Sequence, residues 1–165
     1  MKNLPKLAEE CRRDLMSAQI HTGNIRNWIV NTRARARWGL CSKVASGLFD
    51  IEISAILLQD CVDDQTVKNT IAHELLHTIP GCFKHTGKWK QYAIVVNRKL
   101  PQYNIKSRSS YKEKGLEDAR PDPKCRYVLC CLQCGKEIKR QRKSVAVKNP
   151  ECYRCLCGGR LTRVK

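Results

Sequence analysis

Long apolar runs are missing from this chain of 165 residues. A membrane-spanning helix needs about 18 consecutive apolar residues, and a secretory signal needs an apolar core of about 7 to 15 residues. The first residues, Met1 to Lys6, mix charged, polar and apolar types and contain no such core. We therefore expect a cytoplasmic protein without a membrane partner, associated with the nucleoid if it binds DNA.

Acidic residues are also scarce, because 15 Asp and Glu stand against 32 Lys and Arg, for a net charge of +17. Residues 121–165 carry twelve basic and three acidic side chains, a net charge of +9. This excess favours a polyanionic partner, and we expect DNA. Two basic segments stand out, namely alternating arginines at 33, 35 and 37 on an expected strand and a dense run at 139–143. Few aromatic residues accompany them, so phosphate contacts should dominate over base recognition.

Histidine is rare as well, yet three of the four histidines lie within thirteen residues. The segment from His73 to His77 reads H-E-L-L-H, and residues four apart share one face of a helix. Two imidazoles at this spacing can hold one zinc ion, while Glu74 lies to the side and suits a general base. The segment predicts the catalytic zinc site of a hydrolase, with Glu74 acting on a water molecule.

The third zinc ligand is inferred by exclusion. No Asp or Glu occurs between Leu75 and Lys112, so the downstream glutamate ligand of thermolysin-type enzymes has no nearby candidate. The metzincin pattern would need glycine at position 80 and histidine at 83, where this chain has Pro80 and Phe83. We expect His85 to complete the site, and Cys82 is the rival.

Cysteine is abundant, and seven of the eleven cysteines lie between residues 125 and 157. An odd count and the missing export signal favour metal binding over disulfides. Cys131 and Cys134 form a first pair followed by glycine. For the second pair we favour Cys155 and Cys157, which two glycines follow, with Cys152 as the alternative. Together these pairs predict a zinc ribbon with one structural zinc ion.

The remaining patterns predict an α+β chain. Apolar residues recur at helical spacing in residues 4–18, 64–79 and 87–100. Strands are expected from Trp28 through Leu40 and at 49–54, where apolar and polar residues alternate. We expect a catalytic domain at 1–106, a linker at 107–124 and the ribbon at 125–165.

Several of these segments together resemble the SprT-like family, the relatives of the Spartan protease. Its third histidine stands in a segment that here reads His85-Thr86-Gly87-Lys88-Trp89. Residues 37–41 and 49–54 resemble its strand pair, and residues 153–159 resemble its C-terminal ribbon. The resemblance implies a zincin-like metalloprotease that acts on DNA-associated or DNA-crosslinked proteins, with zinc on His73, His77 and His85 and with Glu74 as the base. The chain ends soon after the ribbon, so regulation through a long tail is not implied.

We expect the polypeptide substrate to add to the sheet along the edge of strand 48–54. Two alternatives stay open at this point. A deformylase-like zinc hydrolase would take its third ligand from an upstream cysteine, for which Cys41 is the candidate. A nucleic-acid-binding module would use the ribbon and leave the histidine site catalytically idle.

Overall fold

The computed structural model describes residues 1–35, 37–117 and 125–164. The described chain contains both helices and two three-stranded sheets, which confirms the predicted α+β class. The chain divides into two compact units, Met1–Arg120 and Pro121–Lys165. None of the helices within the described ranges is long and apolar enough to cross a membrane.

The first unit opens with helix α1 (Leu4–Ser17), whose N-terminus is capped by the Asn3 side chain. The carbonyl oxygen of that side chain accepts a hydrogen bond from the backbone of Lys6, and a proline occupies the first turn. The apolar residues predicted to form one face are all buried: Leu4, Leu7, Cys11, Leu15 and Ala18. This helix therefore packs against the core, as its periodicity predicts.

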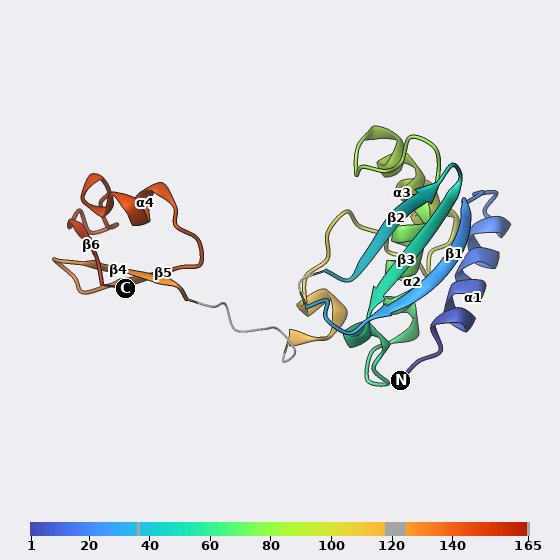
Figure 1. The fold of residues 1–165 in the computed structure, drawn as a ribbon, viewed down its shortest axis with the longest axis horizontal. Helices are drawn as coiled ribbons and strands as arrows, with labels where there is room; N and C mark the ends of the chain where they lie inside the picture. Colours follow the sequence, from blue (N-terminus) through green and yellow to red (C-terminus); the bar gives the residue numbers. More distant parts are fainter. Residues whose placement is uncertain (36, 118–124, 165) are drawn as a thin grey trace. The chain divides into compact units, whose positions relative to one another are not determined.

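A three-stranded sheet forms the second layer of this unit (Figure 1), with strand order β1-β3-β2. Strand β1 (Asn24–Asn31) runs parallel to β3 (Leu48–Ser54), and β2 (Gly39–Ala45) runs antiparallel to it. On β3, Phe49, Ile51 and Ile53 are buried, Asp50 and Glu52 between them are half-buried, and the last residue, Ser54, is buried as well. The predicted alternation is confirmed for residues 49–53 and ends at the buried Ser54, and one face of the sheet packs on the helices.

Two expectations about the strands are wrong. Strand β3 is central and paired on both sides, so a substrate cannot pair along its edge; β2 and β1 are the edge strands. The expected continuous strand from Trp28 to Leu40 is also interrupted. The side chain of Asn31 accepts hydrogen bonds from the backbone of Arg33 and Ala34, which turns the chain out of the sheet. The three arginines at 33, 35 and 37 thus lie outside the strands.

Helix α2 (Asp64–Leu76) follows a short 3-10 turn, η1 (Ala55–Leu58), and is capped by Asp63. Val67, Ile71 and Leu75 are fully buried, and each such side chain contributes about 1.5–3 kcal/mol through removal from water. The helix ends three residues before the expected Ile79. Pro80 explains this difference, because it lacks the N–H that would bond the Leu76 carbonyl and it disfavours a helical conformation at the residue before it.

Helix α3 (Gly87–Lys99) is followed by a segment that packs on the first unit. Leu116 is buried in the main core, Tyr111 packs against it, and the Trp38 indole donates a hydrogen bond to the Ser109 carbonyl. A 3-10 turn, η2 (Lys112–Lys114), lies in this segment. Residues 107–117 therefore belong to the first unit instead of a linker, and residues 118–124 of that expected linker lie outside the described residues.

The second unit has its own small core around strand β4 (Tyr127–Cys131). Strands β5 (Glu137–Arg140) and β6 (Leu161–Arg163) pair antiparallel with β4 on either side. Two short helical segments, α4 (Val145–Lys148) and η4 (Pro150–Cys152), connect β5 with β6. The buried residues of this core are Leu129, Cys131, Val147, Cys155 and Leu161.

Candidate metal centres and the adjoining cavity

Three histidine side chains converge at the C-terminal end of α2. His73 lies in the last turn of the helix, His77 is its C-cap, and His85 comes from the loop before α3. Their Nε2 atoms lie 3.3 Å (73 to 77), 3.0 Å (77 to 85) and 2.7 Å (73 to 85) apart. Imidazole nitrogens around one tetrahedral zinc ion lie about 3.3 Å apart, because each Zn–N bond is about 2.0–2.1 Å. The three histidines can therefore hold one metal ion.

Backbone carbonyls orient two of these rings. The Nδ1 of His73 lies 2.8 Å from the carbonyl oxygen of Lys106, and that of His77 lies 2.8 Å from the carbonyl oxygen of Cys82. A carbonyl can only accept, so each Nδ1 carries the proton and each Nε2 keeps a free lone pair. This arrangement fixes the tautomer that metal binding requires.

Trp89 of α3 supports the histidine cluster from the core side. Its side chain is 1% exposed, and its ring lies 4.7 Å from His73, 5.5 Å from His77 and 4.7 Å from His85 between centroids. Burial lowers the pKa of all three histidines, and that of His73 falls to about 3 through burial and the neighbouring rings of His77 and His85. Neutral imidazole is the metal-binding form, so the enclosure favours ligation.

Glu74 is held between α2 and the first residues of β2. Its side chain is 6% exposed, and burial raises its pKa to about 8 against the opposing effects of a Cys41 backbone hydrogen bond and the Arg37 charge. Gly39 makes this position possible, since a Cβ atom there would lie 2.5 Å from the Glu74 Oε1. The carboxylate thus sits against the edge strand, one residue along α2 from His73.

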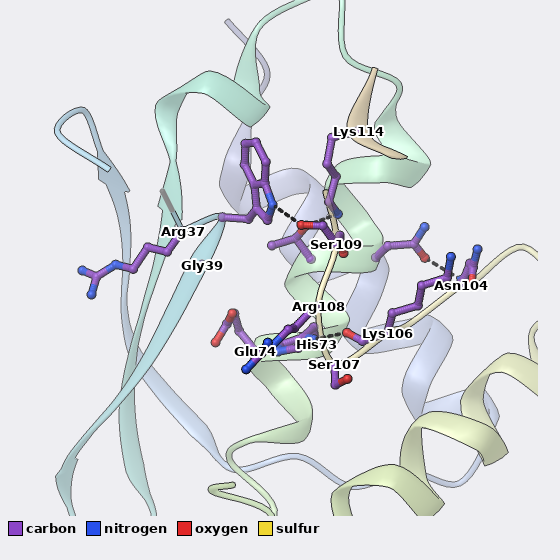
Figure 2. A pocket seen from close by; sticks show the side chains of 13 residues that line it. Arg37, Gly39, His73, Glu74, Asn104, Lys106, Ser107, Arg108, Ser109 and Lys114 are labelled. Atoms are coloured by element: carbon purple, nitrogen blue, oxygen red, sulfur yellow. Dashed lines mark hydrogen bonds between the residues drawn. The ribbon is translucent and has the colours of Figure 1, made fainter. Parts of the chain in front are cut away.

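A cavity of about 390 Å³ opens beside His73 and Glu74. Figure 2 shows both side chains near Ser107 and Arg108, with Lys114 and Asn104 farther along the cavity. Most of its lining is polar or basic. The lining residues are Arg37, Trp38, Gly39, Asn69, Thr70, His73, Glu74, Asn104, Lys106, Ser107, Arg108, Ser109 and Lys114.

The two cysteines considered as rival ligands do not join the histidine cluster. Among the described residues, the ligand-capable atoms within 4.8 Å of one another at this site come from His73, His77 and His85 alone. Cys82 contacts the site through its carbonyl, while its thiol is buried. Burial and the neighbouring Glu74 raise the pKa of Cys41 to about 12, which disfavours the thiolate that metal binding needs.

Four cysteines in the second unit form another group that can hold a metal ion. The sulfur atoms of Cys131, Cys134, Cys155 and Cys157 lie within 4.8 Å of one another. The Sγ atoms of Cys131 and Cys157 are 3.5 Å apart, and those of Cys134 and Cys155 are 3.7 Å apart. Four sulfurs around a tetrahedral zinc ion lie about 3.8 Å apart. Cys152, the alternative considered above, is exposed and outside this group.

Backbone turns shape both halves of the cysteine group. Gly135 and Gly158 adopt φ values of 69° and 85°, which side chains disfavour, and a Cβ at Gly159 would lie 2.6 Å from the Cys131 sulfur. Backbone hydrogen bonds from Cys134, and then from Gln133, lower the pKa of Cys131 to about 6. The glycines after each pair, which guided the choice of Cys155 and Cys157, thus have a direct geometric role.

Several residues of the histidine site have no signal in the sequence. Lys106 and Cys82 act through carbonyl oxygens, which every residue type possesses. Lys114 and Arg108 line the cavity from a segment expected to be a linker. Gly39 belongs to the segment 37–41 that resembles a family strand, and nothing in that pattern indicates its contact with Glu74. The acid-free stretch between Leu75 and Lys112 was the one available hint, because it leaves the cavity wall basic.

Comparisons with known proteins add no family. No protein-family model, no curated protein and no solved structure matches this chain.

Proposed function

We propose that the first unit is a zinc-dependent metallopeptidase of the zincin-like, SprT-like type that acts on proteins associated with or crosslinked to DNA. The observation that carries this proposal is the convergence of three histidine Nε2 atoms beside a buried glutamate at the wall of a cavity. A purely structural site would use four protein ligands and would have no need of such a carboxylate.

Zinc suits both donor sets. Three neutral imidazoles fit a catalytic zinc ion, and four thiolates fit a structural one. Zinc at the histidines would supply Lewis acidity and lower the pKa of a bound water molecule to near 7.

Glu74 would supply the proton transfers. As a carboxylate it takes a proton from the attacking water, whose oxygen bonds to the peptide carbonyl carbon. It then gives the proton to the leaving nitrogen as the C–N bond breaks, so that a peptide and water become a carboxyl group and an amine. A cation at the adjacent histidines would lower the Glu74 pKa and favour the carboxylate at neutral pH.

The edge strand β2 is the proposed place for the peptide substrate. Its first residue, Gly39, contacts Glu74 closely, and the backbone of Cys41 is hydrogen bonded to the same carboxylate. A substrate strand paired with β2 would bring its backbone beside the base. Main-chain pairing selects little for side chains, so any sequence preference should come from contacts outside this strand pairing.

DNA binding is proposed mainly for the second unit. Lys139, Arg142 and Lys143 are exposed around β5, and Tyr127 and Tyr153 are the two tyrosines of this unit. Arginines 33, 35 and 37 add exposed charge in the loop before β2. These cations would contact phosphates, so affinity for DNA should fall steeply with salt.

The direct test is proteolysis of a DNA-binding protein with and without single-stranded DNA, comparing wild type with Glu74→Gln. We expect cleavage by wild type and a loss of at least about 100-fold in the variant, with zinc content unchanged. Glu9→Gln, an exposed substitution on α1, is the matched control and should retain activity. No cleavage by zinc-loaded wild type under either condition would refute the peptidase proposal.

The alternative function is a nucleic-acid-binding ribbon module whose histidine site is idle or deformylase-like. The cysteine group and the basic surface of the second unit favour binding independently of any catalysis. The proteolysis test above decides whether the histidine site is idle, and the zinc content of His85→Ala and Cys41→Ser separates the proposed site from a deformylase-like one. The proposed site loses zinc in the His85 variant alone, whereas a deformylase-like site would lose it in the Cys41 variant alone.

A further inference from the structure

We infer that the cavity beside the histidines binds a carboxylate of the substrate through Lys114 and Arg108, so that the site prefers an acidic residue or a free C-terminus close to the scissile bond. This inference rests on the proposed peptidase function and names the substrate class for the same site. It is carried by a buried ammonium without a paired carboxylate at the wall of the cavity.

Lys114 is unusual because its charge is enclosed. The residue is 8% exposed, and its Nζ donates to the Thr70 hydroxyl at 2.7 Å and to the Thr66 carbonyl at 3.4 Å. An ammonium has three donors, so one remains for a ligand. Burying an unpaired charge is costly, and a ligand carboxylate would offset that cost.

The one carboxylate whose charge acts on this ammonium has other partners. Glu113, the charge that acts on Lys114, accepts hydrogen bonds from the Lys106 ammonium and from the backbone and hydroxyl of Ser110. Arg37 at the cavity wall is paired with Glu52 at 3.1 Å. Within the described ranges, Lys114 and the exposed Arg108 form no ion pair of 4.0 Å or less. Within those ranges two cations therefore face the cavity without an ion pair, although the Glu74 carboxyl lines the same cavity.

The distance along α2 between Thr70, which binds Lys114, and His73 indicates how far Lys114 lies from the proposed site of hydrolysis. Thr70, the hydrogen-bond partner of Lys114, lies three residues before His73, a rise of about 4.5 Å along the helix. Consecutive residues of an extended peptide are about 3.3 Å apart. A carboxylate at Lys114 would therefore belong to a residue within about two positions of the bond that is cleaved.

A carboxylate fits this recess better than a nucleic-acid phosphate does. The cavity volume of about 390 Å³ accommodates one acidic side chain, and Ser107, Asn69 and Asn104 offer further polar groups on its wall. A phosphodiester carries sugars on both sides, which would have to enter the recess with it. Most of the exposed cations proposed for DNA lie outside the cavity, at Arg33 and Arg35 in the loop before β2 and on the second unit. Arg37 of that loop does line the cavity, but it is paired with Glu52.

Binding to the full-length, zinc-loaded Glu74→Gln protein gives the first test. Fluorescent peptides that differ only by Glu or Gln at one position would be compared by anisotropy, with the position moved along the peptide. At one position we expect the Glu peptide to bind roughly tenfold more tightly, as one charge-assisted hydrogen bond allows. No preference for Glu at any position would overturn the inference.

Substitutions locate the preference. Lys114→Met and Arg108→Gln, each in the Glu74→Gln background, should reduce it to less than about twofold to threefold. Arg108 is exposed, so its substitution tests the cavity independently of the change in stability that replacing the buried lysine brings. Lys90→Met, an exposed lysine of α3, is the matched control and should leave the preference intact. A preference that survives both cavity substitutions would overturn the inference.

Competitors distinguish the source of the carboxylate and keep this test separate from the peptidase proposal. The α-amide of N-acetylglutamate, whose single carboxylate is that of the side chain, should displace the peptide in the case of an acidic side chain, and N-acetylglycine in the case of a free C-terminus. Stronger displacement by inorganic phosphate or a short oligothymidylate than by either carboxylate would overturn the inference. If wild type cleaves no peptide but the Glu peptide still binds more tightly than the Gln peptide, only the peptidase proposal fails. If wild type cleaves peptides but binds the Glu and Gln peptides equally, only the carboxylate site is refuted.

Discussion

Gly39 illustrates how one missing side chain can control the chemistry of the proposed site. A Cβ atom at this position would lie 2.5 Å from Oε1 and 2.7 Å from Cγ of Glu74, closer than side chains pack. The neighbouring atoms belong to the end of a flexible side chain, so the carboxylate would move instead of the backbone. The absence of a side chain at Gly39 thus determines where the Glu74 carboxylate can lie.

Gly39→Ala should therefore reduce peptide hydrolysis by roughly 10- to 100-fold without loss of zinc, because displacement of the base affects proton transfer and leaves the histidines in place. Activity on a peptide and zinc content by mass spectrometry are the two measurements. Gly87→Ala is the matched control, since a Cβ there meets nothing within 4 Å. Equal activity of the two variants would contradict the proposed contact with Glu74.

The buried Lys114 leads to a second prediction, which concerns how the free energy of unfolding changes with pH. Burial lowers its pKa from 10.5 to about 8, so between these values the unfolded chain holds more protons than the folded chain does. The free energy of unfolding of wild type should rise with pH across this window and show the full cost of burial below pH 8. Lys114→Met removes the titration and should be more stable than wild type at pH 7, by up to about 3 kcal/mol.

The measurement is urea unfolding of the full-length protein and of Lys114→Met at intervals from pH 7 to 10.5. We expect the difference between the two proteins to shrink steadily as pH rises, because deprotonated lysine no longer carries a buried charge. Lys90→Met, which is exposed, should show no such trend. A constant difference from pH 7 to 10.5 would show that Lys114 is not perturbed by burial.

At the scale of elements, α2 joins the core to the candidate metal centre. Residues at 67, 71 and 75 face the core, and His73 and His77 lie at the same spacing on another face. This division follows from helical periodicity, so the sequence alone was sufficient to predict it. The cysteine pairs of the second unit were equally readable, because knuckle spacing and the following glycines are local features.

Features that depend on distant contacts could not be predicted in the same way. The central position of β3 in the sheet cannot be read from an alternation of apolar and polar residues. Likewise, the turn stabilised by the Asn31 side chain separates two segments that both have strand-like composition. The segment at 107–117 lacks an apolar period, yet Leu116 and Tyr111 anchor it to the core. The backbone carbonyls that bind the histidine rings are positioned by the course of the backbone, so the residue types at 82 and 106 do not predict them.

Removing the N-terminal cap of α2 tests whether zinc affinity at the histidines depends on the stability of the start of this helix. Asp63→Ala removes the side chain that accepts the Thr66 amide at 3.0 Å, and should cost about 1 kcal/mol of unfolding free energy. Zinc affinity should be unchanged, because the histidines lie in and just beyond the last turn and are fixed by contacts outside α2. Thermal denaturation and a competitive zinc assay give the two values.

Asp60→Ala is the matched control for that cap. Its carboxylate pairs only with the exposed N-terminus of the chain among the interactions described, and such pairs contribute little. We expect a change within about 0.5 kcal/mol. Equal destabilisation by the two substitutions would contradict the assigned capping role of Asp63.

The whole molecule combines two units, each with a core and a group of residues that can hold a metal ion. Excess positive charge is divided almost equally, with +8 on residues 1–120 and +9 on residues 121–165. The second unit is much shorter, so its charge density is higher. If DNA recruitment and peptide hydrolysis are separate tasks, the second unit should dominate the salt dependence of binding.

Charge removal in the full-length protein tests this division. Lys139, Arg142 and Lys143 are exposed on the second unit; Lys6, Arg13 and Lys90 are exposed on the first. Replacing either set with glutamine lowers the net charge by the same three units. Each lost phosphate contact reduces the slope of log affinity against log salt by about 0.7 on single-stranded DNA, so the first triple variant should lose up to about 2 units.

Binding of both variants and wild type to a fluorescent oligothymidylate, measured between low and moderate salt, would give the slopes. The control variant should keep a slope close to that of wild type, because general attraction depends on net charge whereas counterion release depends on phosphates actually contacted. Equal losses in both variants would mean that the charge acts as a diffuse field and that the second unit has no special role. A selective loss would identify the second unit as the part that contacts DNA, because both variants carry the same net charge.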